Sequence, residues 1–163
     1  MKQMQEVMAV TYKDGKVYFL DQTRLPEETV VQEMKTVEEC REAIQTLKVR
    51  GAPAIGIGAA FSMVVASRAI AADTFADFYP AFKKAKEYLA TSRPTAVNLF
   101  WALERMDKTA AALSDRPLDE VRQAIVDEAV KIQNEDIEVC RKIGEYGQEI
   151  ISPGMGILTH WNV

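Results

Sequence analysis

The strongest constraint on the fold is the stretch from Gly51 to Ser67, which contains no charged residue. Most of its residues are small or apolar, and small residues allow a helix to approach its neighbours closely. Pro53 suits the first turn of such a helix, because the amide hydrogen that proline lacks has no intrahelical partner there. The stretch therefore predicts a buried helix that begins near Pro53 and packs against other elements.

A second interpretation concerns the start of this stretch, the run Arg50–Ala60 (RGAPAIGIGAA). Here a cation and a Gly-rich backbone stand immediately before a helix. The free N–H groups and the positive end of the helix dipole attract an anion, which the Arg50 guanidinium can hold through two hydrogen bonds. A single Gly-rich loop is a weak motif, so the residues alone leave close packing and anion binding both open.

A similar arrangement recurs in the segment Ser92–Leu99 (SRPTAVNL). Arg93 precedes a proline and a predicted helix start, and the hydroxyl groups of Ser92 and Thr95 can donate hydrogen bonds. Two such loops in one small acidic chain suggest a site for a small anion. The alternative is that Arg93 only pairs with a surface carboxylate.

Composition narrows the class of protein. The chain has 163 residues, 48% hydrophobic and 27% charged, which fits one ordinary domain and the start of another. The net charge of −4 and the absence of a basic block argue against nucleic-acid and membrane-surface partners. No apolar leader or spanning segment is apparent, so the predicted location is cytoplasmic. Cys40 and Cys140 lie in apolar helical patterns and are predicted to be buried thiols, with no metal site.

The first part of the chain predicts a small antiparallel sheet. Two apolar runs, 8–12 and 17–20, flank an Asp-Gly pair and form a hairpin signal, and a third short strand is expected over 29–34. Thr36 and Glu39 match a capping box, which predicts a helix running to about Lys48.

Three further helices are predicted after the buried one, and the fold class is therefore α+β, with a helical bundle following the sheet. Each of the three has apolar residues at spacings of three and four. These are Phe75, Phe78, Phe82, Ala85 and Leu89 in the first; Leu99, Leu103 and Met106 in the second; and Val121, Ile125, Ile132, Cys140 and Ile143 in the third. Gly144 and Gly147 are expected to weaken or end the last helix.

The last segment, 151–163, no longer shows the helical spacing of apolar residues. A Pro-Gly turn precedes a short apolar run that predicts a buried parallel strand, so residues 1–150 are expected to form one domain and residues 151–163 to begin another. His160 is the single histidine and follows this predicted strand. No partner for catalysis or metal binding is evident, which favours a structural role.

Three segments, in this order, resemble the methylthioribose-1-phosphate isomerase family: Arg50–Gly56, Ser92–Leu99 and Ile157–His160. That family shares a superfamily with the alpha, beta and delta subunits of initiation factor 2B and with ribose-1,5-bisphosphate isomerase. The resemblance implies the N-terminal domain of an aldose-ketose isomerase and the first strand of a Rossmann-like domain. It also implies conversion of 5-methylthioribose 1-phosphate to 5-methylthioribulose 1-phosphate in methionine salvage, a sugar-phosphate ligand, no cofactor, and a homodimer in full-length members.

The resemblance further implies that Arg50, Gly51 and Ala52 contact the substrate and that Arg93 helps to hold it. In the family a catalytic cysteine follows the Thr-His pair, but this chain has Trp161 at that position, and the family's catalytic aspartate has no counterpart within it. Cys40 and Cys140 do not match that motif. We therefore expect an inactive N-terminal fragment. A ribose-1,5-bisphosphate isomerase-like enzyme and a non-catalytic regulatory module like initiation factor 2B are the alternatives.

Overall fold

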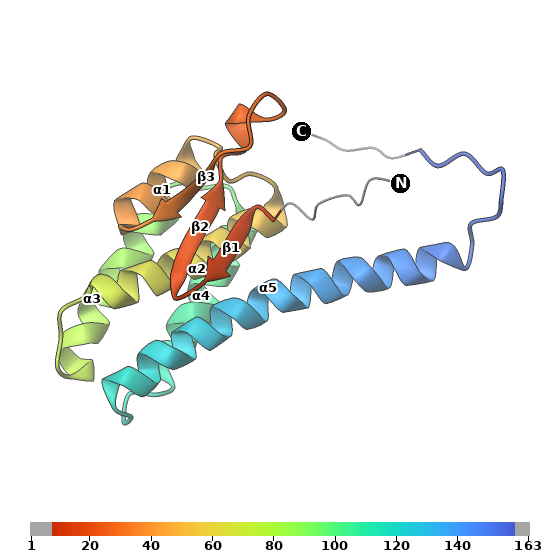
Figure 1. Ribbon diagram of the computed structural model, residues 1–163. Helices are drawn as coiled ribbons and strands as arrows, with labels where there is room; N and C mark the ends of the chain where they lie inside the picture. Colours follow the sequence, from red (N-terminus) through yellow and green to blue (C-terminus); the bar gives the residue numbers. More distant parts are fainter. Residues whose placement is uncertain (1–7, 159–163) are drawn as a thin grey trace.

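A small sheet packs on a helical bundle in the computed structural model, which describes residues 8–158 (Figure 1). The sheet has the order β1-β2-β3 and is antiparallel throughout, and five helices follow it. The α+β fold class predicted from the sequence is therefore confirmed. The elements are β1 (Val10–Lys13), β2 (Lys16–Leu20), the 3-10 helix η1 (Gln22–Arg24), β3 (Val31–Met34), α1 (Val37–Gln45), α2 (Ala52–Ala69), α3 (Phe75–Ala90), α4 (Val97–Ala111) and α5 (Leu118–Gln148).

Helix α2 is the centre of this arrangement and contacts the sheet and each of the other four helices. Thirteen of its eighteen residues are buried, which explains why the stretch carries no charge. Among the described helices it alone is long and apolar enough to cross a membrane, but 72% of it is buried inside the fold. Its composition is therefore that of a core helix, and the predicted buried helix is confirmed.

The sheet covers one side of α2. Asp14 and Gly15 have positive φ angles of 51° and 76° and form the tight turn between β1 and β2. The directly opposed residues Val10 and Phe19 are both buried, and the ring of Tyr12 stacks on Phe61 of α2 at 5.6 Å between centroids. The predicted hairpin and third strand are confirmed, with bounds that differ by one or two residues.

Helix α1 begins where predicted but ends earlier. Thr36 and Glu39 make both hydrogen bonds of a capping box. The helix ends at Gln45 and not near Lys48, because Leu47 takes a left-handed conformation with φ 65°. This turn brings Val49 back into the core, where its side chain is fully buried and its N–H donates to the Ala43 carbonyl at 3.1 Å.

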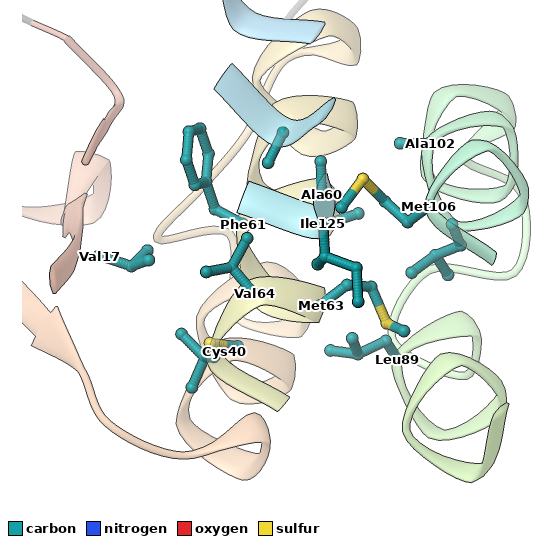
Figure 2. Close-up of a cluster of buried hydrophobic side chains, with 14 of the residues drawn as sticks. Val17, Cys40, Ala60, Phe61, Met63, Val64, Leu89, Ala102, Met106 and Ile125 are labelled. Carbon is teal, nitrogen blue, oxygen red and sulfur yellow. The ribbon is translucent and has the colours of Figure 1, made fainter. Parts of the chain in front are cut away.

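Helices α3, α4 and the first half of α5 cover the other side of α2. Figure 2 shows side chains from these elements meeting in one cluster, with Met63, Leu89, Met106 and Ile125 close together. The aromatic stripe of α3 contributes Phe78 and Phe82, both fully buried, so it is a core face as predicted.

The second half of α5 extends beyond the rest of the fold (Figure 1). Ile132 is its last buried residue, and Ile143 is 67% exposed, contrary to the predicted apolar core face. Periodicity indicates which face is apolar, but no described element lies against this part of the helix. The helix passes Gly144 without a break and ends one residue after Gly147.

The two cysteines differ, and the prediction that both are buried is wrong for one of them. Cys40 is fully buried, whereas Cys140 is exposed because it lies on the uncovered half of α5. Burial also raises the pKa of the Cys40 thiol to about 12.

We therefore expect one fast-reacting thiol in this chain. At mildly alkaline pH only roughly one Cys40 side chain in 10⁴ is a thiolate, and that side chain is also inaccessible. Titration of the native chain with a disulfide reagent is expected to modify Cys140 rapidly and Cys40 only on unfolding. Two rapid equivalents from the wild type, or one from Cys140→Ser, would contradict this assignment.

The segment after α5 contains the predicted turn, and only the first part of the predicted strand lies among the described residues. Gly154 has φ 89° and the Met155 N–H donates to the Ser152 carbonyl at 3.1 Å, as in a Pro-Gly turn. Residues 155–158 form no strand, and Leu158 is 95% exposed. A strand needs a neighbour for its hydrogen bonds, and none of the described segments provides one here. The predicted features at Thr159, His160 and Trp161 lie outside the described residues.

Candidate substrate-binding site

An open pocket of about 860 Å³ lies at the N-terminal end of α2. Three segments that are distant in the sequence form it: the loop around η1, the turn from α1 into α2, and the loop before α4. All four residues implied as substrate contacts line it. The lining residues are Gln22, Leu25, Leu47, Arg50, Gly51, Ala52, Pro53, Ile55, Arg93, Thr95, Ala96, Val97 and Asn98.

Gln22 of η1 holds the turn that carries Arg50 through two hydrogen bonds. The Gln22 N–H donates to the carbonyl of Lys48 at 2.9 Å, and Gln22 Nε2 lies 3.5 Å from the carbonyl oxygen of Arg50. Gly51 is the N-cap of α2 and has φ 90°, a conformation that residues with a Cβ rarely adopt. This glycine allows the chain to enter α2 directly after Arg50.

The first turn of α2 leaves backbone donors available at the pocket. Its first hydrogen bond runs from the Ile55 N–H to the Gly51 carbonyl at 2.9 Å, and no side chain caps the helix. Within residues 8–158, the N–H groups of Ala52 and Ala54 have no protein acceptor, and Pro53 has no N–H. Free donors at the positive end of a helix dipole favour a bound anion.

The loop before α4 forms the facing wall. Arg93 and Thr95 line the pocket, but Ser92 does not: its side chain is buried and its hydroxyl donates to the Leu89 carbonyl at 2.7 Å. The suggestion that Ser92 donates to an anion is therefore wrong, because its hydroxyl closes the end of α3. Helix α4 begins at Val97, three residues after the proline.

Neither arginine of the pocket is neutralised within the described part of the chain. No carboxylate there lies within 4.0 Å of the Arg50 or Arg93 guanidinium. By contrast, Arg105 of α4 lies 2.5 Å from Glu135, and this hydrogen bond holds the pKa of Glu135 below its ordinary value. The alternative of an ion-paired Arg93 finds no support, and the pocket carries net positive charge.

The described lining of this pocket offers groups that suit ligand binding. Its described lining contains no carboxylate, imidazole, thiol or amine, so no group there can transfer a proton near neutral pH. Within residues 8–158 no three His, Cys, Asp or Glu side chains gather as a metal site requires. Guanidinium groups and free N–H groups are instead well suited to a phosphate.

Several lining residues were not predicted as site residues from the sequence. Gln22 and Leu25 belong to a loop that reaches the pocket only in the folded chain, and Leu47 follows the end of α1 in the turn toward Arg50. Asn98 lies inside the Ser92–Leu99 segment, and a polar residue in the first turn of a helix beside Arg93 was a usable signal.

Known proteins similar to this chain include several bacterial isomerases. A methylthioribose-1-phosphate isomerase from Symbiobacterium thermophilum is 46% identical over 157 residues, which are 96% of this chain and 44% of the relative. A 5-deoxyribose 1-phosphate isomerase from Petrotoga mobilis is 48% identical over 148 residues, or 91% of this chain and 43% of the relative. The chain thus spans less than half the length of these relatives.

Two solved structures have the same fold over most of the chain. A 5-methylthioribose 1-phosphate isomerase from Pyrococcus horikoshii matches with a TM-score of 0.84 and 45% identity, covering 88% of this chain and 40% of its own. The delta subunit of translation initiation factor eIF-2B from A. fulgidus also has a TM-score of 0.84, with 38% identity, covering 91% of this chain and 43% of its own. The model of the Initiation factor 2 subunit family matches residues 48–163, and the chain belongs to that family.

Proposed function

We propose that this chain is the N-terminal, substrate-binding part of an aldose-ketose isomerase that converts 5-methylthioribose 1-phosphate to 5-methylthioribulose 1-phosphate. The observation that carries the proposal is the pocket at the start of α2, which Arg50 and Arg93 both line without a carboxylate partner among the described residues. The names of the relatives at 43–48% identity point to the same class of ligand.

The reaction explains why binding and catalysis need different groups. The C1–ring oxygen bond breaks, the hydrogen on C2 ends on C1, and the proton of the C2 hydroxyl ends on the ring oxygen. A phosphate on C1 prevents spontaneous ring opening, so acid-base or hydride-transfer chemistry must be positioned at C1 and C2. Arg50, Gly51, Ala52 and Arg93 would hold the phosphate, with the free N–H of Ala52 as one of the donors. Residues outside this pocket would supply the proton transfers.

The domain organisation belongs to the same proposal. Residues 1–150 would form the substrate-site domain and residues 151–163 would begin the second, in keeping with the share of the relatives that the chain covers.

Free thiols at Cys40 and Cys140 are compatible with a cytoplasmic location, which a phosphorylated sugar substrate also favours. Exposed apolar residues on α5, such as Ile143 and Tyr146, are compatible with a homodimer of the full-length protein.

A second candidate substrate is 5-deoxyribose 1-phosphate, because a relative with that activity in its name is 48% identical. Both sugars carry the phosphate on C1 and differ only at C5. The third alternative, a regulatory module, has no such substrate, and the equal TM-scores of the two solved structures mean that fold alone does not separate it from an enzyme.

Ligand binding by the 163-residue chain is the direct test. We expect 5-methylthioribose 1-phosphate to bind with at least about tenfold higher affinity than unphosphorylated 5-methylthioribose, because charge-assisted hydrogen bonds contribute about 1.5–3 kcal/mol. Calorimetry or NMR titration measures both affinities, with 5-deoxyribose 1-phosphate and ribose 1,5-bisphosphate as competitors. Equal affinity for the two methylthio sugars, or binding of neither, contradicts the proposal and favours the regulatory alternative.

A further inference from the structure

The relative position of the two arginine-bearing loops depends on how closely α2 and α4 pack. Arg50 directly precedes α2 and Arg93 lies shortly before α4, and both residues line the pocket. The two helices pack against each other in the core. A change in the separation of their first turns therefore moves the backbone that carries one arginine relative to the backbone that carries the other.

Gly56 of α2 lies close against Asn98 in the first turn of α4. A Cβ atom at position 56 would lie 3.2 Å from the carbonyl oxygen of Asn98 and 3.3 Å from its Cβ. Both distances are shorter than optimal contact between such atoms. The Asn98 carbonyl belongs to the first turn of α4, so it cannot rotate away as the end of a long side chain can.

The loop that carries Arg93 is coupled to this turn through the backbone. The Ala96 N–H donates to the Arg93 carbonyl at 3.0 Å, and the Leu99 N–H donates to the Ala96 carbonyl at 3.0 Å. The α4 side of the contact is the freer one, since Val97 is 78% exposed whereas α2 is enclosed by the core. A side chain at position 56 would therefore displace the first turn of α4 and, with it, the Arg93 loop.

We propose that Gly56 is a positioning residue, whose missing side chain allows Arg93 to reach the same anion as Arg50. This inference rests on the proposed function, because it takes the pocket to be the sugar-phosphate site. It goes beyond that function by assigning a role to a residue that does not line the pocket.

The test compares two variants that both disturb α2. Gly56→Ala introduces the crowding at Asn98. Val121→Ala removes a fully buried side chain from the first turn of α5. This turn lies at the end of α2 opposite the pocket, because its next residue, Arg122, donates to the Ile70 carbonyl there. Both substitutions are expected to lower the melting temperature, and only Gly56→Ala is expected to lower the affinity for phosphate and for 5-methylthioribose 1-phosphate.

Inorganic phosphate and 5-methylthioribose 1-phosphate are titrated into the wild-type chain and both variants below their melting temperatures. We expect Gly56→Ala to weaken binding about tenfold, since sub-ångström displacement of a positioned group is costly, and Val121→Ala to leave it unchanged. Wild-type affinity in Gly56→Ala, or an equal loss in Val121→Ala, overturns the inference. If Gly56→Ala is unfolded, the titration is repeated at low temperature with an osmolyte that is excluded from the protein surface and so favours the folded state. A variant that stays unfolded under these conditions also overturns the inference. A wild-type chain that binds neither probe instead refutes the proposed function.

Discussion

Turnover of 5-methylthioribose 1-phosphate is expected from an extended chain with a thiol at position 161 and not from the 163-residue chain itself. The chimera joins residues 1–163 to the C-terminal part of the Symbiobacterium thermophilum relative, in one version with Trp161 and in one with Trp161→Cys. The resemblance implies a catalytic thiol at this position, an indole cannot replace it in proton transfer, and a positioned general acid or base contributes about 10²–10⁴-fold. We therefore expect the Trp161→Cys chimera to be faster than the Trp161 chimera by a factor in that range.

The control for this experiment is ligand binding by all three proteins, measured with the same sugar phosphate. Because Arg50 and Arg93 are present in each, the affinity should persist where turnover is lost. Turnover by the 163-residue chain, or equal rates in the two chimeras, would show that the catalytic role does not belong to position 161.

Substitution of the two arginines is expected to cause the second large effect, a loss of affinity for the sugar phosphate. Arg50→Ala is expected to weaken binding of 5-methylthioribose 1-phosphate by about 1.5–3 kcal/mol, or roughly 10–150-fold, because it removes charge-assisted hydrogen bonds to the phosphate. Arg50→Lys keeps the charge but loses the two-pronged geometry, so its affinity should be intermediate. Calorimetric titration of each folded variant measures these losses.

A double-mutant cycle shows whether Arg50 and Arg93 act on one anion. If they share it, the loss in Arg50→Ala/Arg93→Ala differs from the sum of the single losses by about 0.5–3 kcal/mol. Arg141→Ala is the matched control, since Arg141 is exposed on the outer half of α5 and pairs with Glu138 at 2.7 Å. Strict additivity in the cycle, or an equally large loss in Arg141→Ala, contradicts a shared site.

Local sequence signals determined most of the elements. The Asp14-Gly15 pair determined the first hairpin, because the two positive φ angles of a tight turn are available at low cost to few other residues. Thr36 and Glu39 determined the start of α1 through hydrogen bonds that span only three residues. The candidate anion site also has a local part, since Arg50, Gly51 and Pro53 are adjacent in the chain and together make a cation beside an uncapped helix start.

Tertiary structure decided which residues share the pocket and which apolar faces are buried. Arg50 and Arg93 line one pocket because α2 and α4 pack together with Gly56 against Asn98. Gly56 and Asn98 stand in the same two segments as the arginines, but neither segment alone shows that the two segments meet. The apolar pattern of α5 likewise continues past Ile132, but only a partner surface can bury it. Periodicity records which face of a helix is apolar, whereas burial and site assembly depend on elements brought together from elsewhere in the chain.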